Sequence, residues 1–164
     1  MLRIKCLRAA LCAVLVSAAI TASGCAGPPP RDALVTFSRA VQTKDWNTAW
    51  GLLSSRERKN FEEKMFAPFK EQFAKLSPEA QKEAAAKIGS TVQDIQKMAA
   101  KDFFSVVMEK SDESRKIPHK IDPDRIVVEQ ESIKGNTARI RLKGQAGEFN
   151  FVKEAGAWKI ELGP

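Results

Sequence analysis

The sequence predicts an α+β fold in which N-terminal helices pack on a C-terminal antiparallel sheet. Between residues 31 and 116, apolar residues recur three or four positions apart, which is the spacing of one helical face. From residue 125 onward the period changes to two, and apolar residues alternate with charged ones between short turn segments. Helices first and a strand meander last favour a single sheet with its helices on one face.

The first expected helix is marked by an apolar face, and the starts of the next two are marked by capping residues. Asp45 is placed to cap a short helix over residues 46–53, and Ser54 with Glu57 fits a capping box for the next helix. The apolar face of the first helix consists of Ala33, Phe37, Ala40 and Val41.

The following helix carries large apolar residues at steps of four, and Pro68 is expected to bend it. Two interpretations apply to its phenylalanines at 61, 66, 69 and 73. They form either an apolar lid or membrane-facing helix, or they pack in the core against the sheet, and we prefer core packing. The residues at steps of four are Phe61, Met65, Phe69 and Phe73.

Start and stop signals then predict two more helical segments. Ser77-Pro78-Glu79 combines an N-cap, a proline at the first helical position and an early acidic residue. Gly89 is expected to end that helix, and Ser90 with Gln93 to start another, which either continues to residue 110 or breaks near Ala100.

The C-terminal part predicts three hairpin-linked antiparallel pairings. Strands are expected over residues 125–133, 138–143, 148–151 and 158–162, with turns between them. One strand face carries the basic stripe Arg139, Arg141 and Lys143. The stripe fits an ordinary solvated face, phospholipid headgroups or an acidic partner, and its position relative to the N-terminal segment separates these interpretations.

The N-terminal segment has a basic start followed by an uncharged apolar stretch over residues 9–22, which is too short to span a bilayer comfortably. This stretch leads into Ala22-Ser23-Gly24-Cys25. The segment resembles a bacterial lipoprotein signal peptide, and these four residues resemble its lipobox. The resemblance implies a diacylglyceryl thioether on Cys25, and Ala26 after it implies the outer membrane of a two-membrane bacterium. Ala22 departs from the leucine usual at its position. The alternative is an ordinary signal peptide cut elsewhere.

This interpretation divides the chain into a signal peptide over residues 1–24, a lipidated cysteine with a proline-rich tether over 25–30, and one α+β domain over 31–164. Removal of residues 1–24 from the 164 leaves 140, the size of one ordinary domain. The leader contains three basic and no acidic residues, so the net charge falls from +7 to +4. The modest excess, without basic clusters interleaved with aromatics, argues against nucleic acid as a partner. The tether is expected to reach on the order of 20 Å.

The few cysteines and the single histidine restrict the chemistry. Cys6 and Cys12 leave with the leader and Cys25 is acylated, so we expect no disulfide in the mature chain. His119 lies in a basic segment and is expected to be a solvated loop residue. Clustered His and Cys ligands are absent from the sequence, and we expect no metal or other cofactor.

Three stretches at the two ends of the mature domain carry a family resemblance. They are residues 37–54, with Asp45-Trp46 and Trp50, residues 136–142, and residues 151–160, which end in Trp158-Lys159-Ile160. Together they resemble the nuclear transport factor 2-like superfamily, specifically its small bacterial lipoproteins. The resemblance implies an N-terminal helix closing a strongly curved sheet into a cone with a pocket, and a sheet face through which relatives dimerise. Residues 61–110 are not explained by it.

The resemblance also frames three functional hypotheses. The first is a non-catalytic, membrane-anchored envelope lipoprotein that binds a small apolar ligand or a protein partner through the cone or the sheet face. Its expected ligand-binding residues are Phe149, Phe151 and Trp158. The second is a purely structural or assembly role, in which those three side chains fill the cone.

The third hypothesis is a cone-pocket enzyme with Asp102 as general base. The chain has no tyrosine, so the acid–base pairs implied by the superfamily's enzymes are not evident. If residues 90–110 form one helix, Asp102 lies between Met98 and Val106 on its apolar face, where desolvation raises the pKa of a carboxyl group. If the helix breaks near Ala100, Asp102 instead occupies a first turn, which favours a carboxylate.

Overall fold

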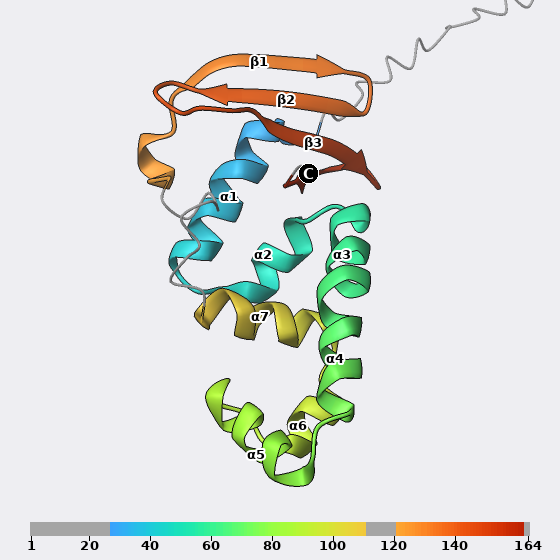
Figure 1. Cartoon of the computed structure of the whole chain (residues 1–164). Coiled ribbons are helices and arrows are strands. Elements are labelled where there is room, and N and C mark those ends of the chain that lie inside the picture. Colours follow the sequence, from blue (N-terminus) through green and yellow to red (C-terminus); the bar gives the residue numbers. More distant parts are fainter. Residues whose placement is uncertain (1–26, 111–120, 163–164) are drawn as a thin grey trace, which may run out of the picture.

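The structure is a computed structural model that describes residues 27–110 and 121–162. It has the predicted α+β architecture, with helices in the N-terminal part and a four-stranded antiparallel sheet at the C-terminus (Figure 1). The helical elements are α1 (Pro30–Gln42), α2 (Trp46–Leu52), α3 (Ser55–Phe61), the π-helical turn η1 (Glu62–Phe66), α4 (Ala67–Ala74), α5 (Pro78–Lys87), α6 (Val92–Lys97), α7 (Ala100–Lys110) and the 3-10 turn η4 (Pro123–Arg125).

The sheet is a simple meander in the order β1-β2-β3-β4, so each strand pairs with its neighbour in sequence. The central strand β2 shows the predicted alternation, with buried and exposed residues following one another along its whole length. The apolar set faces the helices, and the arginines face away from them. The strands are β1 (Val128–Lys134), β2 (Thr137–Leu142), β3 (Phe149–Glu154) and β4 (Ala157–Glu161).

The main hydrophobic core lies between α1 and the inner face of the sheet, beneath which α1 runs in Figure 1. Leu34 and Phe37 of α1 are fully buried, as are Ile140 of β2 and Ile160 of β4. Large side chains from both layers therefore fill the space between helix and sheet, and α2 and α7 close the core from the other side.

α1 begins at Pro30, one residue before the domain boundary predicted from the sequence. Proline suits this position because its fixed φ is already helical and its missing N–H would have no partner in the first turn. Pro30 is buried, and Gly27 lies so close to the β3–β4 turn that a Cβ there would be 2.9 Å from the carbonyl oxygen of Gly156. Part of the predicted tether is thus packed on the domain.

In the long helical column α3–η1–α4, where the sequence predicts a bend at Pro68, the helix continues through a π-helical turn directly before the proline. The N–H of Ala67 donates to the carbonyl of Glu62, five residues back, directly before the proline that lacks an N–H. This turn adds a residue to the helical period. Phe66 rather than Met65 consequently follows Phe61 on the inner face, and Met65 is turned outward with 47% of its surface exposed.

Three phenylalanines of this column, Phe61, Phe66 and Phe69, pack against α7, not against the sheet as we expected, and Phe73 packs in the second core described below. Phe69 stacks on Phe103 with ring centroids 4.4 Å apart, and Phe66 lies 5.6 Å from the same ring. The reason is the direction of the column, which runs away from the sheet in Figure 1, so that α7 is the apolar surface within reach.

A second, smaller core joins α4, α5 and α6 at the end of the molecule farthest from the sheet (Figure 1). Its buried residues are Phe73, Ala85 and Ile95. α6 starts one residue later than predicted, with Thr91 as N-cap and Asp94 in a reciprocal capping box. The Asp94 carboxylate accepts from both the N–H and the hydroxyl of Thr91, which makes this pair the helix start. Among the described helices, none is long and apolar enough to cross a membrane.

Candidate ligand-binding groove

Asp102 is an exposed residue in the first turn of α7. The chain breaks at Met98, which is extended, so residues 90–110 do not form one helix. The Asp102 carboxylate accepts a hydrogen bond of 3.2 Å from the backbone N–H of Ala99, just ahead of the helix. The desolvation on which the general-base hypothesis depends is therefore absent, and Asp102 stabilises a helix start instead.

The three aromatic residues expected to line a cone pocket are part of the main core. Phe151 is 1% exposed and Trp158 7% exposed, and Phe149 is half-buried against the same cluster. Leu34 and Phe37 of α1 fill the space that they face. These aromatic side chains thus fill the space of the expected pocket, which is the arrangement considered for a structural role. The groove and the shallow pocket described below are lined by other residues.

Two predicted features lie outside the described residues: lipidation at Cys25 and the solvated loop histidine His119. Within residues 27–110 and 121–162, no group of three His, Cys, Asp or Glu side chains is placed to hold a metal ion.

An apolar groove is present beside the sheet, and its position depends on how α3 is attached to β4. Leu53 forms a parallel bridge with Ile160, and the N–H of Ser54 donates to the Ile160 carbonyl at 2.9 Å. The Ser54 hydroxyl then caps α3 by accepting from the N–H of Glu57 at 3.1 Å. The segment before α3 thus extends the sheet past β4 and starts the helix at its edge.

A carboxylate from β3 reinforces this attachment. Glu154 accepts hydrogen bonds of 2.8 Å from both the backbone N–H and the hydroxyl of Ser55. Burial alone would raise the pKa of Glu154, but these two hydrogen bonds, together with the nearby charges of Arg58 and Lys159, lower it below its ordinary value. The start of α3 is consequently held from two strands.

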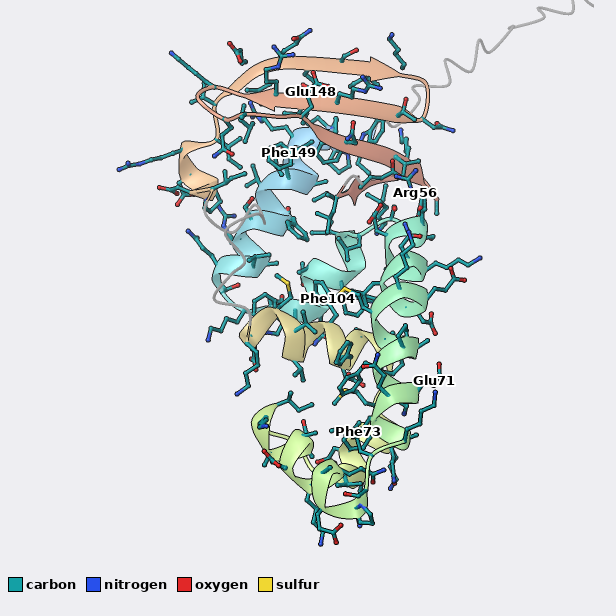
Figure 2. The ribbon with its side chains drawn as sticks, in the orientation of Figure 1. Arg56, Glu71, Phe73, Phe104, Glu148 and Phe149 are labelled. Atoms are coloured by element: carbon teal, nitrogen blue, oxygen red, sulfur yellow. The ribbon has the colours of Figure 1, made fainter. Side chains whose placement is uncertain are left out.

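The groove itself has a volume of about 640 Å³ and runs between α3, η1, α7 and the residue after β4. Its floor is aromatic, because Phe61 and Phe104 lie 5.6 Å apart and both contact Trp50 behind them. Figure 2 shows Phe104 between α7 and the helical column. Met65 and Leu162 flank the opening with 47% and 46% of their surfaces exposed.

The rim of the groove is polar and carries two cations. Arg56, labelled at the sheet end of α3 in Figure 2, forms ion pairs with Glu161 at 3.1 Å and Glu57 at 3.5 Å. Lys64 also lines the groove, and it forms no ion pair with any described residue. An apolar floor of this size with a free ammonium at its edge suits an amphiphile, whose chain is apolar and whose head is anionic.

Sequence reasoning did not identify Met65, Lys64 or Leu162 as groove residues. Met65 follows Phe61 at a helical step of four and was therefore expected on the inner face. The usable signal was Pro68 three residues later, since a proline within a helix is a common cause of a local change in hydrogen bonding.

Comparison of the chain with protein-family models, with curated proteins and with solved structures gave no match. The site is therefore interpreted from its own geometry.

Proposed function

We propose that this chain is a membrane-anchored bacterial envelope lipoprotein that binds an amphiphilic ligand in the groove beside α3, without catalysing a reaction. The observation that carries the binding role is the groove of about 640 Å³, with its aromatic floor and exposed Met65 and Leu162. Pockets for small molecules span roughly 300–1,000 Å³ and combine an apolar lining with few polar groups. The groove volume lies in this range, and five of its nine lining residues are apolar; the polar ones are Arg56, Glu57, Asn60 and Lys64.

The ligand class follows from the rim. A long hydrocarbon chain can lie over Phe61 and Phe104, while an anionic head placed at the opening meets the ammonium of Lys64. Arg56 is already paired with Glu161, so Lys64 is the cation available to the ligand. A fatty acid is the simplest molecule with this combination.

The non-catalytic part of the proposal is supported by the position of the candidate base, Asp102. Asp102 is exposed at a helix start, and it does not line the groove. General acid–base catalysis needs a group within hydrogen-bond reach of the bound substrate. Asp102 offers no such contact to a molecule in the groove.

The anchoring part of the proposal comes from the sequence. The lipobox-like residues ending in Cys25 support lipidation there, and Ala26 supports outer-membrane placement. We also propose that the domain is of the nuclear transport factor 2-like type, which a helix packed on an antiparallel sheet is consistent with. The binding site in this proposal lies beside the sheet, since Phe149, Phe151 and Trp158 are packed in the core on its inner face.

Fluorescent fatty-acid binding tests the groove. With a polyene fatty acid as probe, Met65→Glu is expected to raise the Kd by about tenfold or more, because a carboxylate enters the apolar opening. Lys64→Gln is expected to weaken binding of the acid but not of its uncharged methyl ester. Met65 is half-exposed, so its substitution leaves the core intact.

Leu76→Glu is the matched control, because Leu76 is 41% exposed and lies outside the groove. It should leave the Kd unchanged. Equal weakening by Met65→Glu and Leu76→Glu, or no saturable binding by the wild type, would refute the groove as the binding site.

Intact mass of the membrane-extracted chain tests the anchor: the lipid adduct must be present in the wild type and absent from Cys25→Ala.

A further inference from the structure

We infer that the outer face of the sheet docks on anionic phospholipid headgroups of the membrane that holds the anchor. The inference rests on the proposed lipidation of Cys25 and adds the orientation of the domain on the membrane. Two independent observations carry it: the charge of this face and the place where the chain enters the domain.

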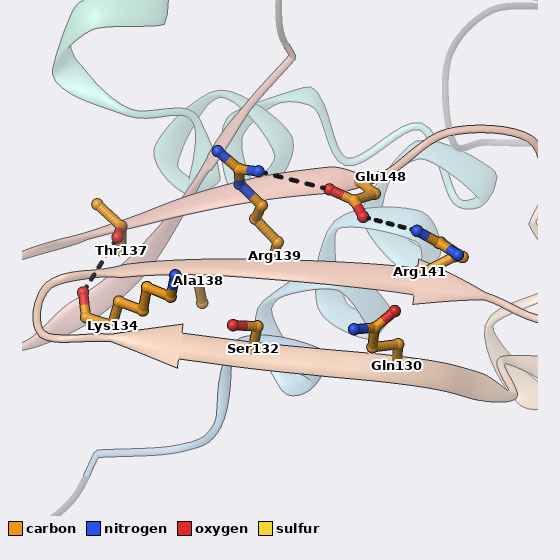
Figure 3. Close-up of a pocket in the computed structure, with 8 residues that line it drawn as sticks. All are labelled: Gln130, Ser132, Lys134, Thr137, Ala138, Arg139, Arg141 and Glu148. Carbon is orange, nitrogen blue, oxygen red and sulfur yellow. Dashed lines mark hydrogen bonds and ion pairs between the residues drawn. The ribbon is translucent and has the colours of Figure 1, made fainter.

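The outer face contains a shallow pocket of about 260 Å³ on β1 and β2 (Figure 3). Three cations line it, Lys134, Arg139 and Arg141, against one carboxylate, Glu148. Glu148 lies 3.1 Å from Arg141 and 3.9 Å from Arg139, so one acid is shared between two guanidinium groups. The side chains of Arg139 and Arg141 remain 70% and 46% exposed, which leaves donors free for phosphate oxygens.

Two further carboxylates of the sheet, on β3 and β4, are already matched. Glu154 is bound by Ser55 and lies 4.0 Å from Arg58, and Glu161 pairs with Arg56 at 3.1 Å. These acids lie on β3 and β4, next to α3. On the outer face, the part formed by β1 and β2 presents three cations against Glu148. Glu131 of β1 pairs with Ile140 and so belongs to the opposite face, and Glu129 lies where the register of β1 shifts.

The chain enters the domain at one end of the same sheet. Gly27 packs against Gly156 in the β3–β4 turn, and the N–H of Lys153 beside that turn donates to the Asn136 carbonyl in the β1–β2 turn at 2.7 Å. Only Ala26 separates Cys25 from Gly27, so the Cα atoms of these two residues are at most about 7.6 Å apart. A lipid on Cys25 thus holds this end of the sheet at the membrane surface.

The same charge argues against a second copy of the chain as the occupant. In a two-fold dimer each face meets an identical face, so a dimer centred on this pocket would bring together the basic side chains of both copies, Lys134, Arg139 and Arg141. Like charges in such an interface repel, whereas a surface of anionic headgroups attracts them. Phospholipid is therefore the occupant that the charge favours.

The test uses the full chain, expressed with its own leader, extracted from membranes and reconstituted into vesicles containing a headgroup-nitroxide lipid. A fluorophore is attached at Gln130→Cys, on the outer face, or at Gln93→Cys, on distal α6. Gln130 lies toward the end of β1 opposite the anchored turn, so tethering alone does not bring it to the membrane. We expect stronger quenching at Gln130 than at Gln93 in phosphatidylglycerol-containing vesicles, reduced by salt.

The difference in quenching between the two sites should disappear in the double variant Arg139→Glu, Arg141→Glu. The control double variant Lys82→Glu, Lys97→Glu makes the same charge change on α5 and α6 and should keep the difference. Equal quenching at the two sites in the lipidated wild type would overturn the inference. So would quenching at Gln130 that is the same in purely phosphatidylcholine vesicles, or quenching that follows protein concentration as in a dimer. Intact mass separates the two proposals: absence of the lipid refutes the anchor and the orientation drawn from it, whereas failure with the lipid present refutes the docking face alone.

Discussion

Two buried serines allow a direct test of how side-chain hydrogen bonds stabilise this fold. Ser38 in α1 and Ser54 before α3 are both 0% exposed. The Ser54 hydroxyl accepts from the N–H of Glu57 at 3.1 Å, whereas the Ser38 hydroxyl has no hydrogen-bond partner among the described residues. Substitution by alanine removes the same oxygen from each site, so the difference between the variants reports the hydrogen bond.

Ser54→Ala is expected to lower the free energy of unfolding by about 1 kcal/mol, the usual effect of losing an N-cap. Ser38→Ala is expected to leave it unchanged or raise it by up to about 1 kcal/mol, since a buried hydroxyl without a partner is removed. Each kcal/mol corresponds to roughly 3 °C in Tm for a domain of this size.

Urea unfolding of the chain, followed by circular dichroism, measures both variants against the wild type. The denaturant dependence should be the same for all three proteins, so that shifts in midpoint report stability. Destabilisation of Ser38→Ala by more than about 1 kcal/mol would contradict the reasoning, because it would reveal a partner for that hydroxyl. A neutral Ser54→Ala would likewise show that the cap contributes nothing.

Three further predictions concern a carboxylate, the second core and the former candidate base. The pKa of Glu154 is lowered on folding, so the stability that its carboxylate contributes is complete above the ordinary pKa of 4.5. This stability is lost as the pH falls from 4.5 through the lower pKa of the folded state. Urea midpoints measured against pH should show the loss in the wild type and a smaller loss in Glu154→Gln. Ile95→Ala should cost about 2–5 kcal/mol locally and raise amide exchange in α5 and α6 while leaving the sheet protected, and equal loss of protection in both would show one cooperative unit. Asp102→Ala should lower the free energy of unfolding by less than about 1 kcal/mol and leave fatty-acid binding unchanged, so a large binding defect would return Asp102 to the functional site.

Much of the fold could be predicted because its signals are local. The alternation of Ala138, Ile140 and Leu142 with two arginines is enough to define a half-buried strand, and the structure confirms it. The caps at Asp45 and Ser77 were predicted for the same reason, since a cap involves atoms only three residues apart.

Local signals failed where two segments competed or where the helical period changed. The choice between one helix and two over residues 90–110 depended on the chain turning at Met98, so that α6 joins the second core and α7 the main one. The position of Asp102 followed from that choice. The outward rotation of Met65 followed from the π-helical turn, which a regular spacing of four does not represent.

The sequence by itself determined the class of fold, the four strands in their order, and the face of the sheet that carries the arginines. Two strand boundaries differ by three residues: β1 begins at Val128 instead of residue 125, and β3 ends at Glu154 instead of residue 151. Only the tertiary structure decided where the candidate ligand-binding groove lies. The groove requires Leu53 to pair with Ile160, more than a hundred residues later in the sequence. It also requires Phe61 of α3 to contact Phe104 of α7. Periodicity and capping report interactions within a few residues, whereas a groove is formed by surfaces that become neighbours when the chain has folded.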